Sequence, residues 1–408
     1  MTDHGRRAPD RVVLLTTDFR PQLGGVADHL HRLAESLAER TRVTVVTSVA
    51  QHGASWPRTY QLELLPPLPE RRLDERIGDA FAPIRKLHTG AYFLALRRYG
   101  RDVAARIAPK PGEEVAVLVG IWDTAAHFWC AALRETGVPY LLFGYGVELV
   151  APLYGGLPEW RRQDFERASR VIGCSRASAA LAGDRLGLTT PAIVVNPSVG
   201  PRPAVPDIAP HAAALRDRLQ AAGGGPVLLS VGRLVARKGF DLVIRSVADI
   251  RREFPNVTYL LAGDGPERPH LDALVHELDL EPQVRFLGSV DETTKWAAYD
   301  LCDIFVMPNR LLGGVDFEGF GIVFLEAALS ERPAIGGRTG GAADAIADEV
   351  TGLLIDPEEP RALTQAIRRL AGDEALRQRL GRAGAEMART THGAQASVAQ
   401  LRGQLGWS

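Results

Sequence analysis

The chain alternates short, nearly continuous hydrophobic runs with longer stretches in which hydrophobic residues recur at helical spacing. The first run, residues 11–17 (RVVLLTT), is followed by a loop at 18–25 and an amphipathic stretch at 26–40. Continuous apolar runs of this length are typical of strands buried on both faces, and the longer period is typical of surface helices. The pattern therefore predicts doubly wound α/β domains built on parallel sheets.

The predicted strands fall into two groups. The first group lies at residues 11–17, 42–47, 115–119, 140–143, 170–174 and 192–195, and the second at residues 227–231, 258–262, 284–287, 303–307, 333–335 and 351–355. Between the groups, a segment that is rich in proline at its start and ends in consecutive glycines indicates a domain boundary at 196–225. We predict two Rossmann-like domains, residues 1–200 and 201–385, facing each other across a cleft. A C-terminal helix in residues 386–408 can then cross back to the first domain.

Composition limits the class of protein without naming a partner. A chain of 408 residues with 46% hydrophobic and 24% charged residues is typical of a soluble protein with two domains. A net charge of -1 gives no electrostatic reason to expect a nucleic-acid partner. Cys130, Cys174 and Cys302 lack the spacing of metal or redox motifs. We interpret them as small buried apolar residues in a reducing compartment.

The sequence predicts a cytoplasmic protein. Its first ten residues are polar, and no apolar run approaches the ~20 residues that span a bilayer. Residues 71–101 contain eight Lys and Arg against three Asp and Glu, together with Phe81, Tyr92 and Phe93. We favour an ordinary helix with a solvated basic face. The alternative is peripheral docking to an anionic inner membrane face, which a lipid-linked acceptor requires.

Ligands of open α/β sheets bind beyond the carboxyl ends of the strands. In the second domain, residues 232–239 (GRLVARKG) follow the first strand and bring several cations to the start of a helix. This arrangement suits a diphosphate, although a solvated basic turn is about as good an interpretation. We expect Lys238 on a surface loop, where a lysine contributes little to folding stability. Gly263 and Gly265 in the next turn are a weak signal, and Gly24 and Gly25 alone favour a tight turn.

The most informative segment is residues 308–330, PNRLLGGVDFEGFGIVFLEAALS. It joins a buried strand to an apolar helix through glycines, so unpaired amides and the positive end of a helix are available to a phosphate. Glu318 and Glu326 bracket the predicted helix start, and eight helical residues advance about 12 Å. Two glutamates at this spacing also occur by chance, but the strand, turn and helix around them strengthen the signal.

Several of these segments together resemble a known family. They are the early GG, GRL…RKG, LLAGDGP, FLGSV, and E-G-F-G-x-V-x-L-E followed by a Gly-Gly turn. They resemble the retaining glycosyltransferases of family 4, which have the GT-B fold. The tract GGVDFEGFGIVFLEA is most similar to members that transfer mannose to phosphatidylinositol-type acceptors in actinobacteria.

The resemblance implies a hexosyltransferase that moves a sugar from a UDP- or GDP-sugar to an acceptor hydroxyl with retention of configuration. The second domain is expected to bind the donor, and the first to bind a small-molecule or lipid-linked acceptor. Arg233 and Lys238 match the cations on the diphosphate, Glu318 the group on the sugar hydroxyls, and Glu326 the group on the ribose. The expected catalytic residues are Arg233, Lys238 and Glu318. The expected donor-binding residues are Gly24, Gly25, Tyr145, Gly263, Gly265, Ser289, Val290, Gly319, Phe320, Gly321, Ile322 and Glu326.

A departing diphosphate must be neutralised by a metal ion or by fixed donors and cations. The sequence contains no Asp-x-Asp pair, and its nearest equivalent is Asp316-Phe317-Glu318. We therefore expect no metal and no other cofactor, with Arg233, Lys238 and the amides of residues 320–322 stabilising the charge. Family members retain configuration without an enzyme nucleophile, so no general base is assigned.

One position departs from the family pattern. Members usually carry a histidine in an H-G-x-E segment, whereas this chain reads FGYGVE at 143–148, with Tyr145 at that position. A phenol donates a hydrogen bond but does not become cationic near neutral pH. His127 is a candidate to compensate, although a lone histidine on a helix is more often structural. A catalytically degenerate relative that binds a nucleotide sugar or regulates a partner is therefore the alternative function.

Overall fold

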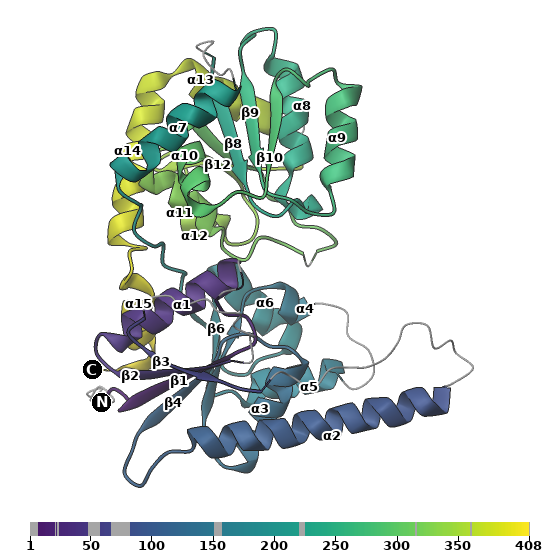
Figure 1. The fold of residues 1–408 in the computed structure, drawn as a ribbon, viewed down its shortest axis with the longest axis vertical. Helices are drawn as coiled ribbons and strands as arrows, with labels where there is room; N and C mark the ends of the chain where they lie inside the picture. Colours follow the sequence, from purple (N-terminus) through teal and green to yellow (C-terminus); the bar gives the residue numbers. More distant parts are fainter. Residues whose placement is uncertain are drawn as a thin grey trace. The chain divides into compact units, whose positions relative to one another are not determined.

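The computed structural model describes residues 7–20, 22, 24–47, 58–66, 82–150, 157–219, 225–314, 316–359 and 361–407. The chain forms two compact units (Figure 1). Unit 1 comprises Met1–Cys174, Ser178–Val195 and Val398–Ser408, and unit 2 comprises Ser175–Ala177 and Asn196–Ser397. Each unit contains a parallel sheet with helices packed on it, which confirms the predicted α/β class.

The sheet of unit 1 has the order β3-β2-β1-β4-β5-β6-β7. Its strands are β1 (Arg11–Thr16), β2 (Arg42–Thr47), β3 (Gln61–Leu64), β4 (Val115–Val119), β5 (Tyr140–Gly144), β6 (Arg170–Gly173) and β7 (Ile193–Val194). The side chains of β1 alternate between two apolar cores, with Val13 and Leu15 in one and Val12 and Leu14 in the other. Both faces of the sheet are therefore covered, as the continuous apolar runs predict.

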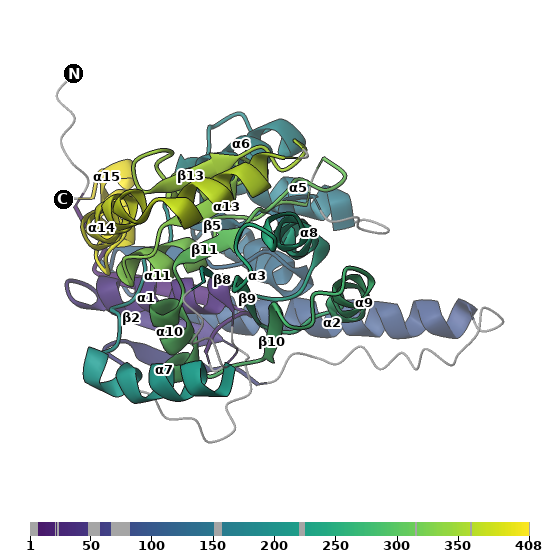
Figure 2. The ribbon, with the colours of Figure 1, turned by 90° about the horizontal axis from the view of Figure 1, so that it is seen from above.

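Of the helices in the described residues, seven belong wholly or mainly to unit 1. They are α1 (Gly25–Ala38), α2 (Ala82–Ile107), α3 (Thr124–Glu135), α4 (Val147–Val150), α5 (Leu157–Arg167), α6 (Arg176–Leu186) and α15 (Ala396–Leu405). In both views of the ribbon, the amino-terminal part of α2 extends beyond the sheet (Figures 1 and 2). From α15, Val398 and Leu401 are buried in the core of unit 1. In the described residues, no helix has the length and hydrophobicity needed to cross a membrane.

The sheet of unit 2 has the order β10-β9-β8-β11-β12-β13. Its strands are β8 (Val227–Val231), β9 (Thr258–Ala262), β10 (Val284–Gly288), β11 (Ile304–Met307), β12 (Ala334–Gly337) and β13 (Gly352–Ile355). Its helices are α7 (Val205–Leu219), the 3-10 helix η2 (Ala236–Lys238), α8 (Phe240–Ile250), α9 (Arg268–Glu277), α10 (Glu292–Leu301), α11 (Ile322–Leu329), α12 (Ala342–Ala345), α13 (Ala362–Gly372) and α14 (Glu374–Thr390).

The strand order reverses in each sheet beside its first strand. After β1, β2 and β3, the chain returns to place β4 on the other side of β1, and after β8, β9 and β10 it places β11 on the other side of β8. Ligands of open α/β sheets bind at such a switch point, beyond the carboxyl ends of the strands. In unit 2 that position is occupied by η2 and by the loop between β11 and α11.

Candidate active site

Lys238 lies at the carboxyl edge of the sheet of unit 2, at the end of η2. Its ammonium is 3.1 Å from Glu318 Oε2 and 3.3 Å from Met307 Sδ. Gly239 follows in the left-handed conformation at φ 71°, and a Cβ there would lie 2.4 Å from the carbonyl oxygen of Pro308. Lys238 itself is only 8% exposed. The expectation that Lys238 lies on a solvated surface loop is therefore wrong, because the turn packs directly against β11.

The charged groups around Lys238 are incompletely paired. Arg237 lies 3.9 Å from Glu318 and 3.6 Å from Asp316. Within the described residues, Arg237 Nε, Asp316 Oδ1 and Glu318 Oε2 are buried without a hydrogen-bond partner. Buried polar atoms in native proteins are nearly always satisfied, so a cluster of orphaned ones points to a ligand or to bound water. The carboxyl edge of unit 2 therefore has the chemistry of a binding site for a charged ligand.

The loop at residues 318–321, here called the donor loop, precedes α11. Gly321 adopts the left-handed conformation at φ 90° and serves as the N-cap without a side-chain cap. Among the described residues, the amides of Ile322 and Val323 have no hydrogen-bond acceptor. These amides and the positive end of α11 are available to an anion. Of the amides predicted at residues 320–322, that of Ile322 is among them, and that of Val323 was not predicted. The 12 Å helical separation of Glu318 and Glu326 is wrong, because the helix begins only at Ile322.

Glu326 is buried and paired. Its Oε1 accepts a hydrogen bond from Lys295 Nζ at 2.9 Å, and its Oε2 accepts one from the Tyr299 hydroxyl at 2.9 Å. Burial and the neighbouring carboxylate raise the pKa of Tyr299 well above its ordinary value. Both partners lie on α10, and neither carries a motif that marks it in the sequence. Each carboxylate oxygen keeps a second lone pair, so the pairing leaves room for a further donor.

The other donor-binding candidates of unit 2 divide into exposed groups and packed glycines. Arg233 and Ser289 are exposed, Val290 is partly exposed, and Arg233 forms no hydrogen bond or ion pair within the described part of the chain. A Cβ on Gly263 would lie 2.0 Å from the carbonyl oxygen of Gly232, and one on Gly265 would lie 2.5 Å from that of Leu234. Close backbone packing is thus a sufficient reason for both glycines.

The donor loop rests on the turn at Gly340 and Gly341. The Gly341 amide donates to the Glu318 carbonyl at 2.8 Å, and a Cβ on Gly341 would lie 2.1 Å from the carbonyl oxygen of Gly319. We expect Gly341→Ala to displace the donor loop, because the new Cβ needs the space of the Gly319 carbonyl. Nucleotide binding should weaken by about tenfold or more, equivalent to about 1.4 kcal/mol. Calorimetry with the nucleotide checks this.

Gly372→Ala is the matched control, because a Cβ at Gly372 meets nothing within 4 Å. It should leave the affinity unchanged. Equal affinities for the two alanine variants would show that the turn does not set the donor loop.

In unit 1, Gly24 and Gly25 lie at the start of α1. Gly24 is the N-cap without a side-chain cap, and a Cβ there would meet nothing within 4 Å. The open space is compatible with an approaching ligand. Within unit 1, the carboxyl end of β5 carries Tyr145, whose ring stacks on Phe143 at 6.0 Å between centroids.

The hydroxyl of Tyr145 is buried and, within the described residues, has no hydrogen-bond partner. Burial raises its pKa well above the ordinary value, so the phenol stays protonated. His29 packs edge-on against the same ring at 6.0 Å, and burial with a smaller contribution from Arg32 lowers the pKa of His29 to about 3. The neutral hydroxyl of Tyr145 therefore stands where the family pattern has a titratable histidine, and the neutral imidazole of His29 packs beside it.

His127 has a structural role. Its Nδ1 lies 2.7 Å from Asp164 Oδ2, and its ring stacks on Trp160 at 4.4 Å. Asp164 also accepts hydrogen bonds from Trp122 at 2.9 Å and from Arg134 at 2.5 Å. The network ties α3 to α5 and accounts for His127 without a ligand.

The predicted basic segment at 71–101 lies partly outside the described residues, as does Phe81. In the described part, Phe93 packs against Trp160 at 5.4 Å and Phe128 at 6.0 Å. Leu94 is 69% exposed. This part of α2 is therefore a helix packed on one side, and its other side faces solvent.

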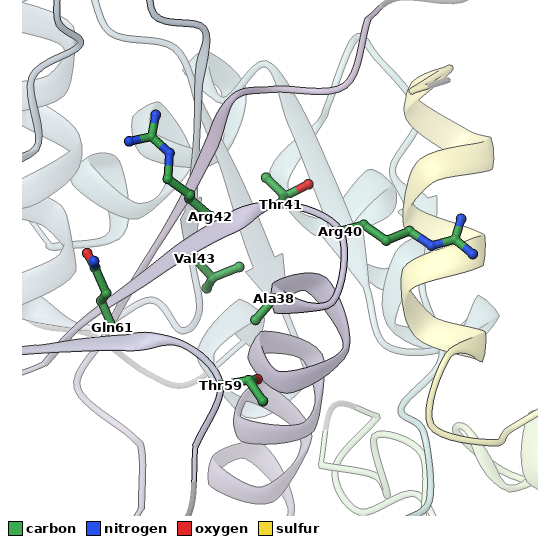
Figure 3. Close-up of a pocket in the computed structure, with 7 residues that line it drawn as sticks. All are labelled: Ala38, Arg40, Thr41, Arg42, Val43, Thr59 and Gln61. Atoms are coloured by element: carbon green, nitrogen blue, oxygen red, sulfur yellow. The ribbon is translucent and has the colours of Figure 1, made fainter.

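A depression of about 370 Å³ lies at the amino-terminal edge of the sheet of unit 1 (Figure 3). It is lined by Ala38, Arg40, Thr41, Arg42, Val43, Thr59 and Gln61. Arg40 and Arg42 point away from each other in the close-up, and Arg42 is paired with Glu113 at 3.0 Å. The two cations do not converge on a common ligand. No group of three or more His, Cys, Asp or Glu side chains suited to a metal ion occurs in the described ranges.

Comparisons with known proteins identify the family. A family model described as glycosyl transferases group 1 matches residues 212–387. Over 383 residues, 91% of this chain and 92% of the relative, the chain is 34% identical to the GDP-mannose-dependent α-(1-6)-phosphatidylinositol monomannoside mannosyltransferase of Mycolicibacterium smegmatis. This chain belongs to the group 1 glycosyltransferases. The family resemblance of its motifs is thereby confirmed.

Other relatives of this group 1 glycosyltransferase agree. It is 33% identical over 409 residues, 92% of the chain and 93% of the relative, to a GDP-mannose-dependent mannosyltransferase of Corynebacterium glutamicum that acts on monoacylated phosphatidylinositol monomannoside. Solved structures of the GT-B fold include Anabaena HepE in complex with UDP, with a TM-score of 0.71, 18% identity, and coverage of 97% and 99%. The enzyme is a GT-B hexosyltransferase that uses a nucleotide-sugar donor.

Proposed function

We propose that this enzyme transfers a mannosyl group from GDP-mannose to a hydroxyl of a phosphatidylinositol mannoside, with retention of configuration. The observation that carries the proposal is the identity of 34% over 91% of the chain to a mannosyltransferase of that donor and acceptor class. The α-D-kanosaminyltransferase of Streptomyces kanamyceticus, in contrast, matches over only 44% of the chain. The likeness to the mannosyltransferase includes unit 1, the unit expected to bind the acceptor, and so favours a lipid-linked acceptor.

The donor diphosphate is assigned to the carboxyl edge of unit 2. Its oxygens accept hydrogen bonds from the amides of Ile322 and Val323, from the Lys238 ammonium and from the exposed Arg233. As the bond between the anomeric carbon and the phosphate oxygen breaks, negative charge grows on the diphosphate. Preorganised amides and cations stabilise that charge without reorganisation at the moment of reaction. The acceptor oxygen bonds to the same face of the anomeric carbon, and its proton passes to the leaving phosphate oxygen.

Glu318 is assigned to the hydroxyls of the donor sugar. Its Oε2 lies 3.1 Å from Lys238 Nζ but is left without a hydrogen bond in the described residues. A diphosphate oxygen can therefore pair with the Lys238 ammonium. Glu318 Oε2 can then accept a hydrogen bond from a sugar hydroxyl, which satisfies that oxygen. Arg237 then lies beside Glu318 and Asp316 as a third cation near the leaving group.

The nucleoside is assigned to Glu326 and to the segment after β10. Glu326 is fixed by Lys295 and Tyr299, so its remaining lone pairs are held ready for ribose hydroxyls. The backbone at Ser289 and Val290 is assigned to the base. In unit 1, the amides at Gly24 and Gly25 and the permanently protonated Tyr145 are assigned to the donor.

The test is a transfer assay with the purified chain. GDP-mannose, UDP-glucose and UDP-N-acetylglucosamine are each offered with phosphatidylinositol mannoside in vesicles, and the product is analysed for linkage and anomeric configuration. We expect transfer from GDP-mannose alone and an α-linked product. Transfer from a UDP-sugar, or a β-linked product, would contradict the proposal.

A further inference from the structure

His392 lies in unit 2 outside every sequence motif of the donor site. It follows the end of α14 and is 3% exposed. Burial lowers the pKa of its imidazole, and the neighbouring Asp344 partly opposes that effect. In the described residues, its Nδ1 is buried without a hydrogen-bond partner. Buried polar atoms usually have hydrogen-bond partners, so a histidine at this buried position needs another explanation, such as the packing of its ring.

The ring of His392 packs against the donor loop. Its centroid lies 5.6 Å from that of Phe320, with 55° between the ring planes. Phe320 is 4% exposed, so its side chain faces the interior while its backbone carries the turn into α11. The position of the Phe320 ring therefore bears on the amides at the start of α11.

The same imidazole is tied to the second support of the donor loop. Asp344 is the neighbour whose carboxylate and backbone oppose the lowering of the His392 pKa by burial. Asp344 belongs to α12, which directly follows Gly341 and its hydrogen bond to the Glu318 carbonyl. His392 thus packs on Phe320 of the donor loop and has Asp344 of α12 as a neighbour.

The backbone around His392 is fixed by neighbouring chain. The Val199 amide donates to the His392 carbonyl at 2.8 Å, and Ser397 Oγ donates to the Asn196 carbonyl at 2.6 Å. These bonds join the two segments of unit 2 that adjoin Val195 and Val398, where the chain changes unit. The backbone of His392 is therefore held by the Val199 amide, and its ring packs against that of Phe320.

We propose that His392 is a positioning residue for the donor: by packing on Phe320 beside α12, it holds the donor loop so that the amides of α11 meet the diphosphate. The inference rests on the proposed role of the donor loop. It assigns His392 no contact with the substrate.

The experiment compares His392→Ala, His392→Phe and Leu271→Ala. Phenylalanine keeps an aromatic ring against Phe320, whereas alanine removes it. Leu271 is buried in α9 at 2% exposure, away from the donor loop in sequence, and its truncation controls for a general loss of stability. Titration calorimetry measures GDP binding, and transfer assays measure the KM for the donor and for the acceptor. Scanning calorimetry measures Tm.

We expect His392→Ala to raise the GDP Kd and the donor KM by about tenfold, with an unchanged acceptor KM, because loop misplacement acts on donor binding. His392→Phe should stay within about threefold of the wild type, and Leu271→Ala should lower Tm with an unchanged GDP Kd. An unchanged GDP Kd in His392→Ala, or an equal rise in either other variant, would overturn the inference. A wild-type enzyme that does not bind GDP would instead contradict the proposed donor.

Discussion

Lys238→Met is expected to lower kcat by about 10²–10³-fold, the usual effect of removing one preorganised donor from a developing oxyanion. The ammonium lies at the carboxyl edge of unit 2, 3.1 Å from Glu318, and is nearly enclosed. Methionine keeps the length and apolar volume of the side chain but removes its charge. Steady-state turnover with saturating GDP-mannose measures the effect.

The same change should also destabilise the fold, because Glu318 is left without its cation. Breaking a buried ion pair by removing one partner costs about 3–5 kcal/mol, and the partial exposure of this pair places it at the low end or below. The double variant Lys238→Met/Glu318→Gln should recover stability without recovering turnover. If the double variant regained activity, or Lys238→Met kept near-normal turnover while folded, Lys238 would have no part in catalysis.

Glu326→Ala should have two large effects. It leaves the Lys295 ammonium and the Tyr299 hydroxyl without their shared carboxylate, which should cost about 3–5 kcal/mol of unfolding free energy. It also removes the proposed ribose ligand, so the GDP Kd should rise by at least about tenfold, equivalent to 1.4 kcal/mol. Denaturant unfolding and calorimetry measure the two quantities separately.

Glu326→Gln separates these roles. An amide oxygen can still accept a hydrogen bond from Tyr299, and Lys295 keeps its ion pair with Glu292 at 2.9 Å. The variant should therefore lose less stability than Glu326→Ala while GDP binding weakens. A glutamine variant with wild-type GDP affinity would rule out the ribose role and leave Glu326 as a core ion-pair partner of Lys295.

Most of the fold could be predicted from the sequence because both sheets are covered on both faces. The strand runs were therefore continuous and apolar, as in Val227–Val231. The strand β3 was missed, because Gln61–Leu64 is an edge strand with no fully buried residue. The start of α11 was placed too early, since the left-handed Gly321 delays the helix to Ile322. Local glycine geometry is not visible in hydrophobic periodicity.

The candidate site was only partly predictable. Motifs located Lys238, Glu318 and Glu326, but the burial of Lys238 against β11 comes from long-range packing. Arg237 was not assigned a role, although it stood beside Lys238 in a basic turn and that turn was the available signal. His392 carries no motif at all, and only its contact with Phe320 distinguishes it.

A crystal structure of the enzyme with GDP is the decisive test of the proposed donor site. We expect diphosphate oxygens within hydrogen-bond distance of Lys238 Nζ and of the amides of Ile322 and Val323, with the ribose hydroxyls hydrogen-bonded to Glu326. A diphosphate bound elsewhere, with Lys238 still against Glu318, would contradict it.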